Sequence, residues 1–193
     1  MGVILGITGL WGCKDESLYI GDNFFNQGNY EKAIEAYTNY LELNPNNIKS
    51  LYNRGRAYEE LGNYERALAD FKRVLVNDPN HVQSNLSVAN NLYRNKLYMD
   101  VIYLCDNVLE AHSQNTNAFL LRGKSHQKAG HINLAMDDYN AAIAVNNERG
   151  EAYFYRGLLK IYLGRKQSAC SDFKIAESLD IKTAVKALKN YCR

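Results

Sequence analysis

The chain has little proline and almost no net charge. Its 193 residues include two prolines, Pro45 and Pro79, and 23 basic against 21 acidic residues leave a formal net charge of +2. Such a balance does not favour a nucleic-acid partner, because proteins that bind nucleic acid usually present an excess of Lys and Arg to the phosphates. Charged residues are 23% and hydrophobic residues 46% of the chain, which excludes a disordered or fibrous protein.

The sequence also lacks the residue clusters that catalysis or metal binding requires. No two of its four histidines have the i, i+4 spacing of a helical metal site, and no two cysteines have C-x-x-C spacing. It contains no phosphate-binding glycine loop. The neighbouring acids Asp137 and Asp138 are interpreted as a solvated helix face rather than a catalytic pair. We therefore expect a protein that is not an enzyme and that uses no cofactor and no metal.

The two prolines lie 34 residues apart, and this spacing recurs along the chain. Glycine or alanine repeats at one position, alanine or valine at a second, and a mostly aromatic residue at a third. The three series are Gly21, Gly55, Ala89, Gly123 and Gly157; Ala33, Ala67, Val101, Ala135 and Ala169; and Tyr37, Phe71, Cys105, Tyr139 and Phe173. They divide the chain into a leader of residues 1–13, five repeats of residues 14–47, 48–81, 82–115, 116–149 and 150–183, and a tail of residues 184–193.

Each repeat is predicted to be a pair of antiparallel helices. In the second repeat, apolar residues follow helical spacing from Ser50 to Leu61 and again from Glu65 to Val76. Between them, Gly62 and Asn63 are typical of a short turn. One hairpin cannot bury both of its faces, but stacked neighbours can. We therefore expect an all-α protein built as a solenoid with a continuous core.

These positions resemble those of the tetratricopeptide repeat family. The second repeat carries the residues that the family favours at eight positions: Gly55, Tyr58, Gly62, Tyr64, Ala67, Phe71, Val74 and Pro79. The resemblance covers residues 14–183 and implies an α-solenoid of five tetratricopeptide hairpins, with residues 184–193 as a capping helix. The third repeat departs most from the pattern, at Ala89, Lys96, Val101, Cys105 and Ser113.

The family's concave face is lined by first-helix positions that stacking does not need. The resemblance implies a partner-binding groove of aromatic, amide and cationic side chains here: Tyr19, Tyr52, Asn53, Arg56, Asn90, Tyr93, Arg94, Lys124, Phe154 and Tyr155. Such a groove suits an extended or helical peptide with apolar anchors, so we expect a protein-protein interaction scaffold with a protein or peptide partner. The family's co-chaperone branch grips a carboxyl terminus with five Lys, Asn and Arg residues. Only Asn53 matches that set, so a chaperone-tail carboxylate clamp is not expected.

Residues 1–12 contain no charged residue and are too few to span a bilayer. With the cysteine that follows, Leu10-Trp11-Gly12-Cys13 resembles the lipobox of bacterial lipoproteins, whose cysteine is acylated after the signal peptide is removed. The resemblance implies lipid attachment at Cys13, membrane contact through that lipid only, and a place in the bacterial cell envelope, at the outer membrane, assisting envelope assembly or secretion. The alternative is a soluble cytoplasmic adaptor with an unprocessed apolar start.

Three further cysteines are Cys105, Cys170 and Cys192. Cys105 is at an aromatic position of the third repeat and is interpreted as a small core residue. An antiparallel cap would bring Cys192 level with Cys170, near the start of the preceding helix. In an exported protein, a disulfide between these two would close a loop of about 22 residues and pin the cap.

Overall fold

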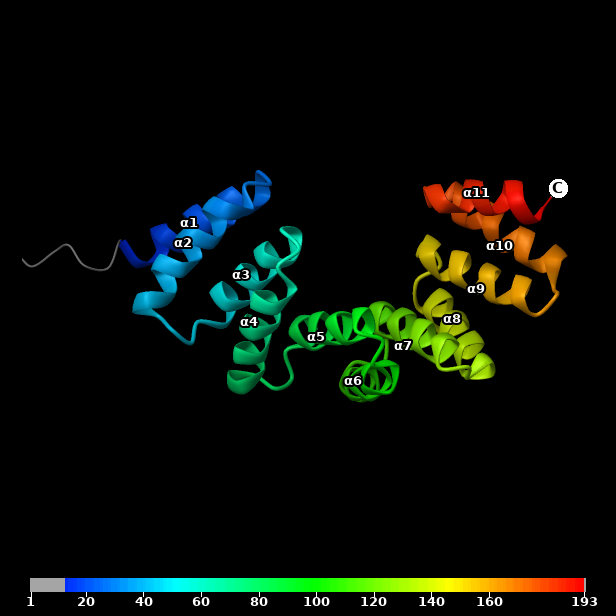
Figure 1. Cartoon of the computed structure of the whole chain (residues 1–193), viewed down its shortest axis with the longest axis horizontal. Helices are drawn as coiled ribbons and strands as arrows, with labels where there is room; N and C mark the ends of the chain where they lie inside the picture. The colour runs from blue at the N-terminus through cyan, green and yellow to red at the C-terminus, as the bar shows by residue number, and fades with distance from the viewer. Residues whose placement is uncertain (1–12, 193) are drawn as a thin grey trace, which may run out of the picture. The chain divides into compact units, whose positions relative to one another are not determined.

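A computed structural model describes residues 13–192 of the chain, with side chains from residue 18 onward. Within these residues the chain is all-α, as expected, with eleven helices and no strand (Figure 1). They form five consecutive pairs and a final helix: α1 (Cys13–Asn26) and α2 (Tyr30–Leu43), α3 (Ile48–Glu60) and α4 (Tyr64–Asn77), α5 (Val82–Arg94) and α6 (Tyr98–Ala111), α7 (Thr116–Lys128) and α8 (Ile132–Val145), α9 (Gly150–Tyr162) and α10 (Lys166–Ser178), and α11 (Lys182–Tyr191). The helices belong to two compact units, which divide between Ser84 and Asn85.

A residue in the left-handed backbone region makes the turn inside each of the five helix pairs. Four of these residues are glycines with φ of 72–85°: Gly28, Gly62, Gly130 and Gly164. The third repeat has Lys96 at the same place, with φ of 63°. Glycine adopts this conformation without steric cost, whereas a residue with a Cβ atom is strained there. The turns are therefore fixed by backbone geometry, even where the sequence departs from glycine.

The centre of four helix pairs is a glycine packed against an aromatic ring. A Cβ atom added to Gly55 would lie 2.6 Å from Cε1 of Phe71. The same relationship holds for Gly21 with Tyr37, Gly123 with Tyr139, and Gly157 with Phe173. In the third repeat, Ala89 and Cys105 hold the two positions, and both are fully buried. The larger small residue there coincides with a smaller partner, so the summed volume changes little.

Three helix pairs also contain a buried ion pair that sequence reasoning did not find. Nε and Nη2 of Arg54 donate to the two carboxylate oxygens of Asp70 at 2.8 and 2.7 Å, while Nη1 donates to Thr38 of the preceding pair at 3.1 Å. Arg122 joins Asp138 to Asp106, and Arg156 joins Asp172 to Asn140, in the same way. We call each of these an arginine clasp. Each clasp holds a hairpin together and fastens it to the one before.

The interpretation of Asp138 as part of a solvated face is wrong. Its exposed fraction is 4%, because it lies under the guanidinium of Arg122. Asp137, by contrast, is exposed, as expected. The signal for a clasp was present in the sequence, since Arg and Asp recur 16 residues apart in three repeats, at Arg54 and Asp70 and at the equivalent positions.

The last helix, α11, packs on α10 as the expected cap. It begins at Lys182, two residues before the boundary expected from the repeat length. Its buried residues are Ala184 and Ala187, and the ring of Tyr191 stacks on Phe173 with centroids 6.2 Å apart. Val185, which was expected on the apolar side, is exposed. Alanine rather than a longer side chain lets the backbone of α11 approach α10 closely.

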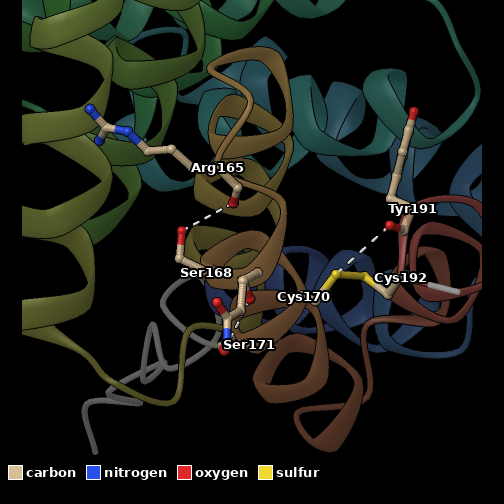
Figure 2. The surroundings of a disulfide bond; sticks show 7 residues. Arg165, Ser168, Cys170, Ser171, Tyr191 and Cys192 are labelled. Atoms are coloured by element: carbon tan, nitrogen blue, oxygen red, sulfur yellow. Dashed lines mark hydrogen bonds between the residues drawn. A yellow bond between two sulfur atoms is a disulfide. The ribbon is translucent and has the colours of Figure 1, made fainter.

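A disulfide joins Cys170 on α10 to Cys192, the residue that follows α11, with Cα atoms 5.7 Å apart (Figure 2). Sγ of Cys170 also lies 4.0 Å from the carbonyl oxygen of Tyr191. The bond closes a loop of 22 residues around the end of the chain. Cys105 is a buried free cysteine, and burial raises the pKa of its thiol to about 12, so it fits the expected role of a small core residue.

Candidate binding surface

The ten side chains predicted to line a groove divide between the two units. Tyr19, Tyr52, Asn53 and Arg56 lie in the first unit, and Asn90, Tyr93, Arg94, Lys124, Phe154 and Tyr155 lie in the second. Tyr19 on α1 is 71% exposed. The prediction of a groove residue can be examined within each unit by asking whether its side chain is free or already engaged in packing.

In the first unit, Asn53 is engaged in a network centred on Asp22. The Asp22 carboxylate accepts hydrogen bonds from Nδ2 of Asn53 at 2.9 Å, from the hydroxyl of Tyr37 at 2.8 Å and from Nζ of Lys49 at 2.7 Å. Burial acts to raise the pKa of Asp22, but the hydrogen bonds and the charge of Lys49 outweigh it and hold that pKa below its ordinary value. The network joins α1, α2 and α3, so Asn53 has a structural role here.

Arg56 and Tyr52 are also partly occupied. The guanidinium of Arg56 lies 3.4 Å from a carboxylate oxygen of Glu59 and 3.4 Å from one of Glu60, one turn further along α3. The Tyr52 ring packs between Phe71 and His81, with centroid distances of 5.8 and 5.3 Å. A ligand carboxylate would therefore compete with two glutamates for Arg56, which makes this cation a weak anchor.

In the second unit, Asn90 and Arg94 are exposed at the surface of α5. Nδ2 of Asn90 donates to the carbonyl oxygen of Leu86, one turn earlier in the same helix. Phe154 instead packs toward the cap, since its ring lies 6.0 Å from that of Phe173 and it contacts the core clusters beneath α11. Of these three residues, Phe154 is the one that the core already uses.

The remaining three residues come together at one place. Nζ of Lys124 on α7 lies 4.8 Å from the ring centroid of Tyr93 on α5 and 5.1 Å from that of Tyr155 on α9 (Figure 1 shows the helices). The Tyr155 ring is itself stacked on Tyr139, and the Tyr93 ring meets Tyr98 edge to face. We call Tyr93, Lys124 and Tyr155 the lysine–tyrosine site. Its members belong to the first helices of three consecutive repeats.

The electrostatics of this site are unusual for a lysine. Burial between the rings lowers the pKa of Lys124, and the charge of Glu151 opposes this only in part. Burial also raises the pKa of Tyr93 and of Tyr155, so both hydroxyls stay neutral at physiological pH. Lys124 makes no ion pair with any residue in the described part of the chain. The site therefore presents a partly dehydrated cation, held by two aromatic faces and lacking a counter-ion.

The sequence carried a signal for this site that the groove prediction did not use. Tyr93, Lys124 and Tyr155 are spaced by 31 residues, three fewer than the repeat length. On stacked first helices, a step of one repeat less three residues moves by nearly one turn along each successive helix. Such a diagonal series places three side chains together although they occupy different positions in their repeats.

Nothing in residues 13–192 adds a catalytic or membrane-spanning feature. The described residues contain no cluster of His, Cys, Asp and Glu able to hold a metal ion. No helix among them has the length and apolar character needed to cross a bilayer. For the lipid-anchor prediction, residues 1–12 lie outside the described residues, and Cys13 is the first residue of α1.

Comparisons with known proteins agree with the repeat organisation. The sequence model of the tetratricopeptide repeat family matches residues 19–82. No curated protein sequence matches the chain. Repeat solenoids of this kind are scaffolds that bind through extended surfaces rather than enzymes.

Two solved structures show the same fold. MamA from Desulfovibrio magneticus RS-1, residues 41 to the end, superposes with a TM-score of 0.77 at 21% identity, covering 89% of this chain and 97% of that one. TTC0263, a thermophilic TPR protein of Thermus thermophilus, superposes with a TM-score of 0.73 at 19% identity, covering 91% of this chain and 99% of that one. By the sequence of residues 19–82 and by its fold, the chain is a tetratricopeptide repeat protein.

Proposed function

We propose that the chain is a non-enzymatic protein-protein interaction scaffold, and that the lysine–tyrosine site binds a peptide segment carrying a carboxylate next to an apolar side chain. The observation that carries the proposal is the position of Lys124, half-buried between Tyr93 and Tyr155 and without an ion-pair partner. Elsewhere in the described residues, half-buried cations such as Arg54, Arg122 and Arg156 are already neutralised by aspartates.

The physical reason is the balance of hydration and pairing. An ammonium group between two rings has lost part of its water, and the rings replace only some of that stabilisation. A carboxylate that reaches Nζ of Lys124 would supply the missing counter-charge, while the tyrosine faces offer apolar contact to a neighbouring side chain. A ligand with both groups gains more than a ligand with either one, which gives the site its preference.

The proposal is tested by selecting peptides from a random displayed library on the intact protein. We expect the selected peptides to be enriched in Asp or Glu beside a large apolar residue, and to lose binding to Lys124→Gln and Tyr155→Leu. Lys174→Gln serves as the matched control, because Lys174 is an exposed lysine on α10 of the same unit. Peptides without acidic residues, or peptides equally well bound by Lys124→Gln, would refute the assignment.

We also propose that the scaffold is a lipoprotein anchored through Cys13, located in the bacterial cell envelope at the outer membrane and assisting envelope assembly or secretion. The support is the uncharged apolar stretch of residues 1–12, which ends directly before Cys13. The test is metabolic labelling with a radioactive fatty acid during expression in a bacterium that processes lipoproteins. Label should enter the wild-type chain and be absent from Cys13→Ser; an unlabelled wild-type chain that stays in the soluble fraction would refute the anchor.

A further inference from the structure

A second surface lies on α6, away from the residues expected to bind a partner. Four side chains follow one line along this helix at successive spacings of four, three and four residues: Met99, Tyr103, Asp106 and Glu110. Residues three and four apart are neighbours on one helix face. Met99 is 61% exposed and Tyr103 is 66% exposed. We call this line the α6 stripe; its first half is apolar and its second half is acidic.

The other repeats provide a comparison within the same chain. Their second helices have exposed residues at the positions equivalent to Met99 and Tyr103, and these are polar residues or alanine. Examples are Glu31 and Glu35 in the first repeat. Packing of the repeats therefore does not require large apolar side chains at these positions. Single exposed apolar residues are common, but an adjacent pair at positions that four other repeats keep free of them indicates a contact surface.

The charge of α6 indicates what kind of partner fits. The helix contains Asp100, Asp106 and Glu110 and no basic residue. Asp106 accepts from Nη1 of Arg122 at 2.6 Å, but the same guanidinium is already paired with the buried Asp138. One cation thus serves two carboxylates, and the end of the stripe stays acidic.

We propose that the α6 stripe is a second docking surface, and that its occupant is a basic amphipathic helix of a partner protein. An apolar side chain of that helix would pack on Met99 and Tyr103, while Lys or Arg two turns away would pair with Asp106 and Glu110. This ligand has the opposite charge to the one that fits Lys124. The two surfaces would therefore recruit different partners to one scaffold.

The test uses synthetic helical peptides that carry a fluorescent label, with binding to the full chain measured by anisotropy at low ionic strength. The probe has Leu at two positions four apart and Lys one and two turns further on, prepared in both sequence directions; the control peptide has Glu in place of Lys. We expect the basic probe to bind, and Tyr103→Ser and Glu110→Lys each to weaken it by about tenfold or more. Val76→Ser is the matched control, since Val76 is an 82% exposed apolar residue on α4.

Three results would overturn the proposal. The first is equal affinity of the basic and acidic peptides, or affinity that Tyr103→Ser and Glu110→Lys leave unchanged. The second is self-association of the wild-type chain that Tyr103→Ser abolishes, which would assign the stripe to a second copy. The third is peptide binding that appears only after deletion of residues 1–12, which would assign it to the chain's own apolar leader. Because Tyr103 and Glu110 are exposed, an unchanged thermal unfolding midpoint is expected to show that both variants fold.

Discussion

Gly55 and Phe71 are in such close contact that the ring of Phe71 occupies the space of a Cβ atom on Gly55, at 2.6 Å from Cε1. The same contact recurs in three other repeats, so it determines how closely the two helices of a hairpin approach. Its energetic value can be measured by adding a single methyl group, because alanine otherwise favours a helix over glycine by about 1 kcal/mol.

We predict that Gly55→Ala lowers the free energy of unfolding by about 1–3 kcal/mol despite the better helix propensity of alanine, because the methyl group overpacks the contact with Phe71. The measurement is urea unfolding followed by circular dichroism. Lys72→Ala, a change at an exposed position of α4, is the control and should have little effect. A Gly55→Ala protein as stable as the wild type would show that the helices can separate without cost.

The arginine clasps can be tested against the chain's own variation. Arg54→Val should destabilise the protein by about 3 kcal/mol, because it leaves the Asp70 carboxylate buried without a partner. The third repeat has Val88 and Leu104 at the two equivalent positions, so the double variant Arg54→Val/Asp70→Leu should recover part of the loss. Unfolding of both variants and of Asp70→Leu closes a double-mutant cycle. Additive effects would mean that Arg54 and Asp70 act independently.

The disulfide is expected to stabilise the end of the chain. Because it closes 22 residues, its loss in Cys170→Ser should cost about 3 kcal/mol in the free energy of unfolding and should raise amide exchange in α11 before other helices. Thiol titration under native conditions gives the independent check, with Cys170 and Cys192 unreactive until a reductant is added. If both react in the unreduced native protein, the bond is absent in solution.

His126 makes stability depend on pH. Burial lowers the pKa of His126 below its ordinary value of 6.5, and Arg122 and His131 act in the same direction, while Asp138 and Asp106 oppose them. The unfolded chain therefore takes up a proton near pH 6.5 that the folded chain resists, so the free energy of unfolding should fall as the pH drops through this value. His126→Phe places an aromatic side chain at the same position without a titrating group. The slope between about pH 7.5 and about pH 5.5 should be smaller in this variant; an identical slope would assign the effect to other groups.

The fold could be predicted from the sequence because the repeat imposes the same requirement five times. Gly55 and its equivalents, and the glycines of the turns, recur at fixed spacing, and each has one structural explanation. The clasps were missed because a pairwise signal, Arg54 with Asp70, does not change the hydrophobic periodicity from which helices are predicted. Asp138 was consequently placed on the surface, although its partner Arg122 makes its burial possible.

The binding surface was harder to predict because exposure does not follow from position in the repeat. Asn53 and Phe154 occupy positions that the family leaves for a ligand, yet one bonds to Asp22 and the other packs beneath the cap. Lys124 stands out only when its neighbours on the adjacent helices are known. Which side chains stay available is thus decided by contacts between repeats, which a list of positions within one repeat does not contain.

The central claim is that Lys124 is the anchor for a ligand carboxylate, and its most direct test is a comparison of dissociation constants. A peptide selected on the wild-type protein is titrated against the wild type, Lys124→Gln and Lys174→Gln, and the series is repeated with its acidic residue changed to the amide. We predict binding weaker by about tenfold or more for Lys124→Gln, no change for Lys174→Gln, and no further loss when the amide peptide meets Lys124→Gln. Equal dissociation constants for the wild type and Lys124→Gln would contradict the account.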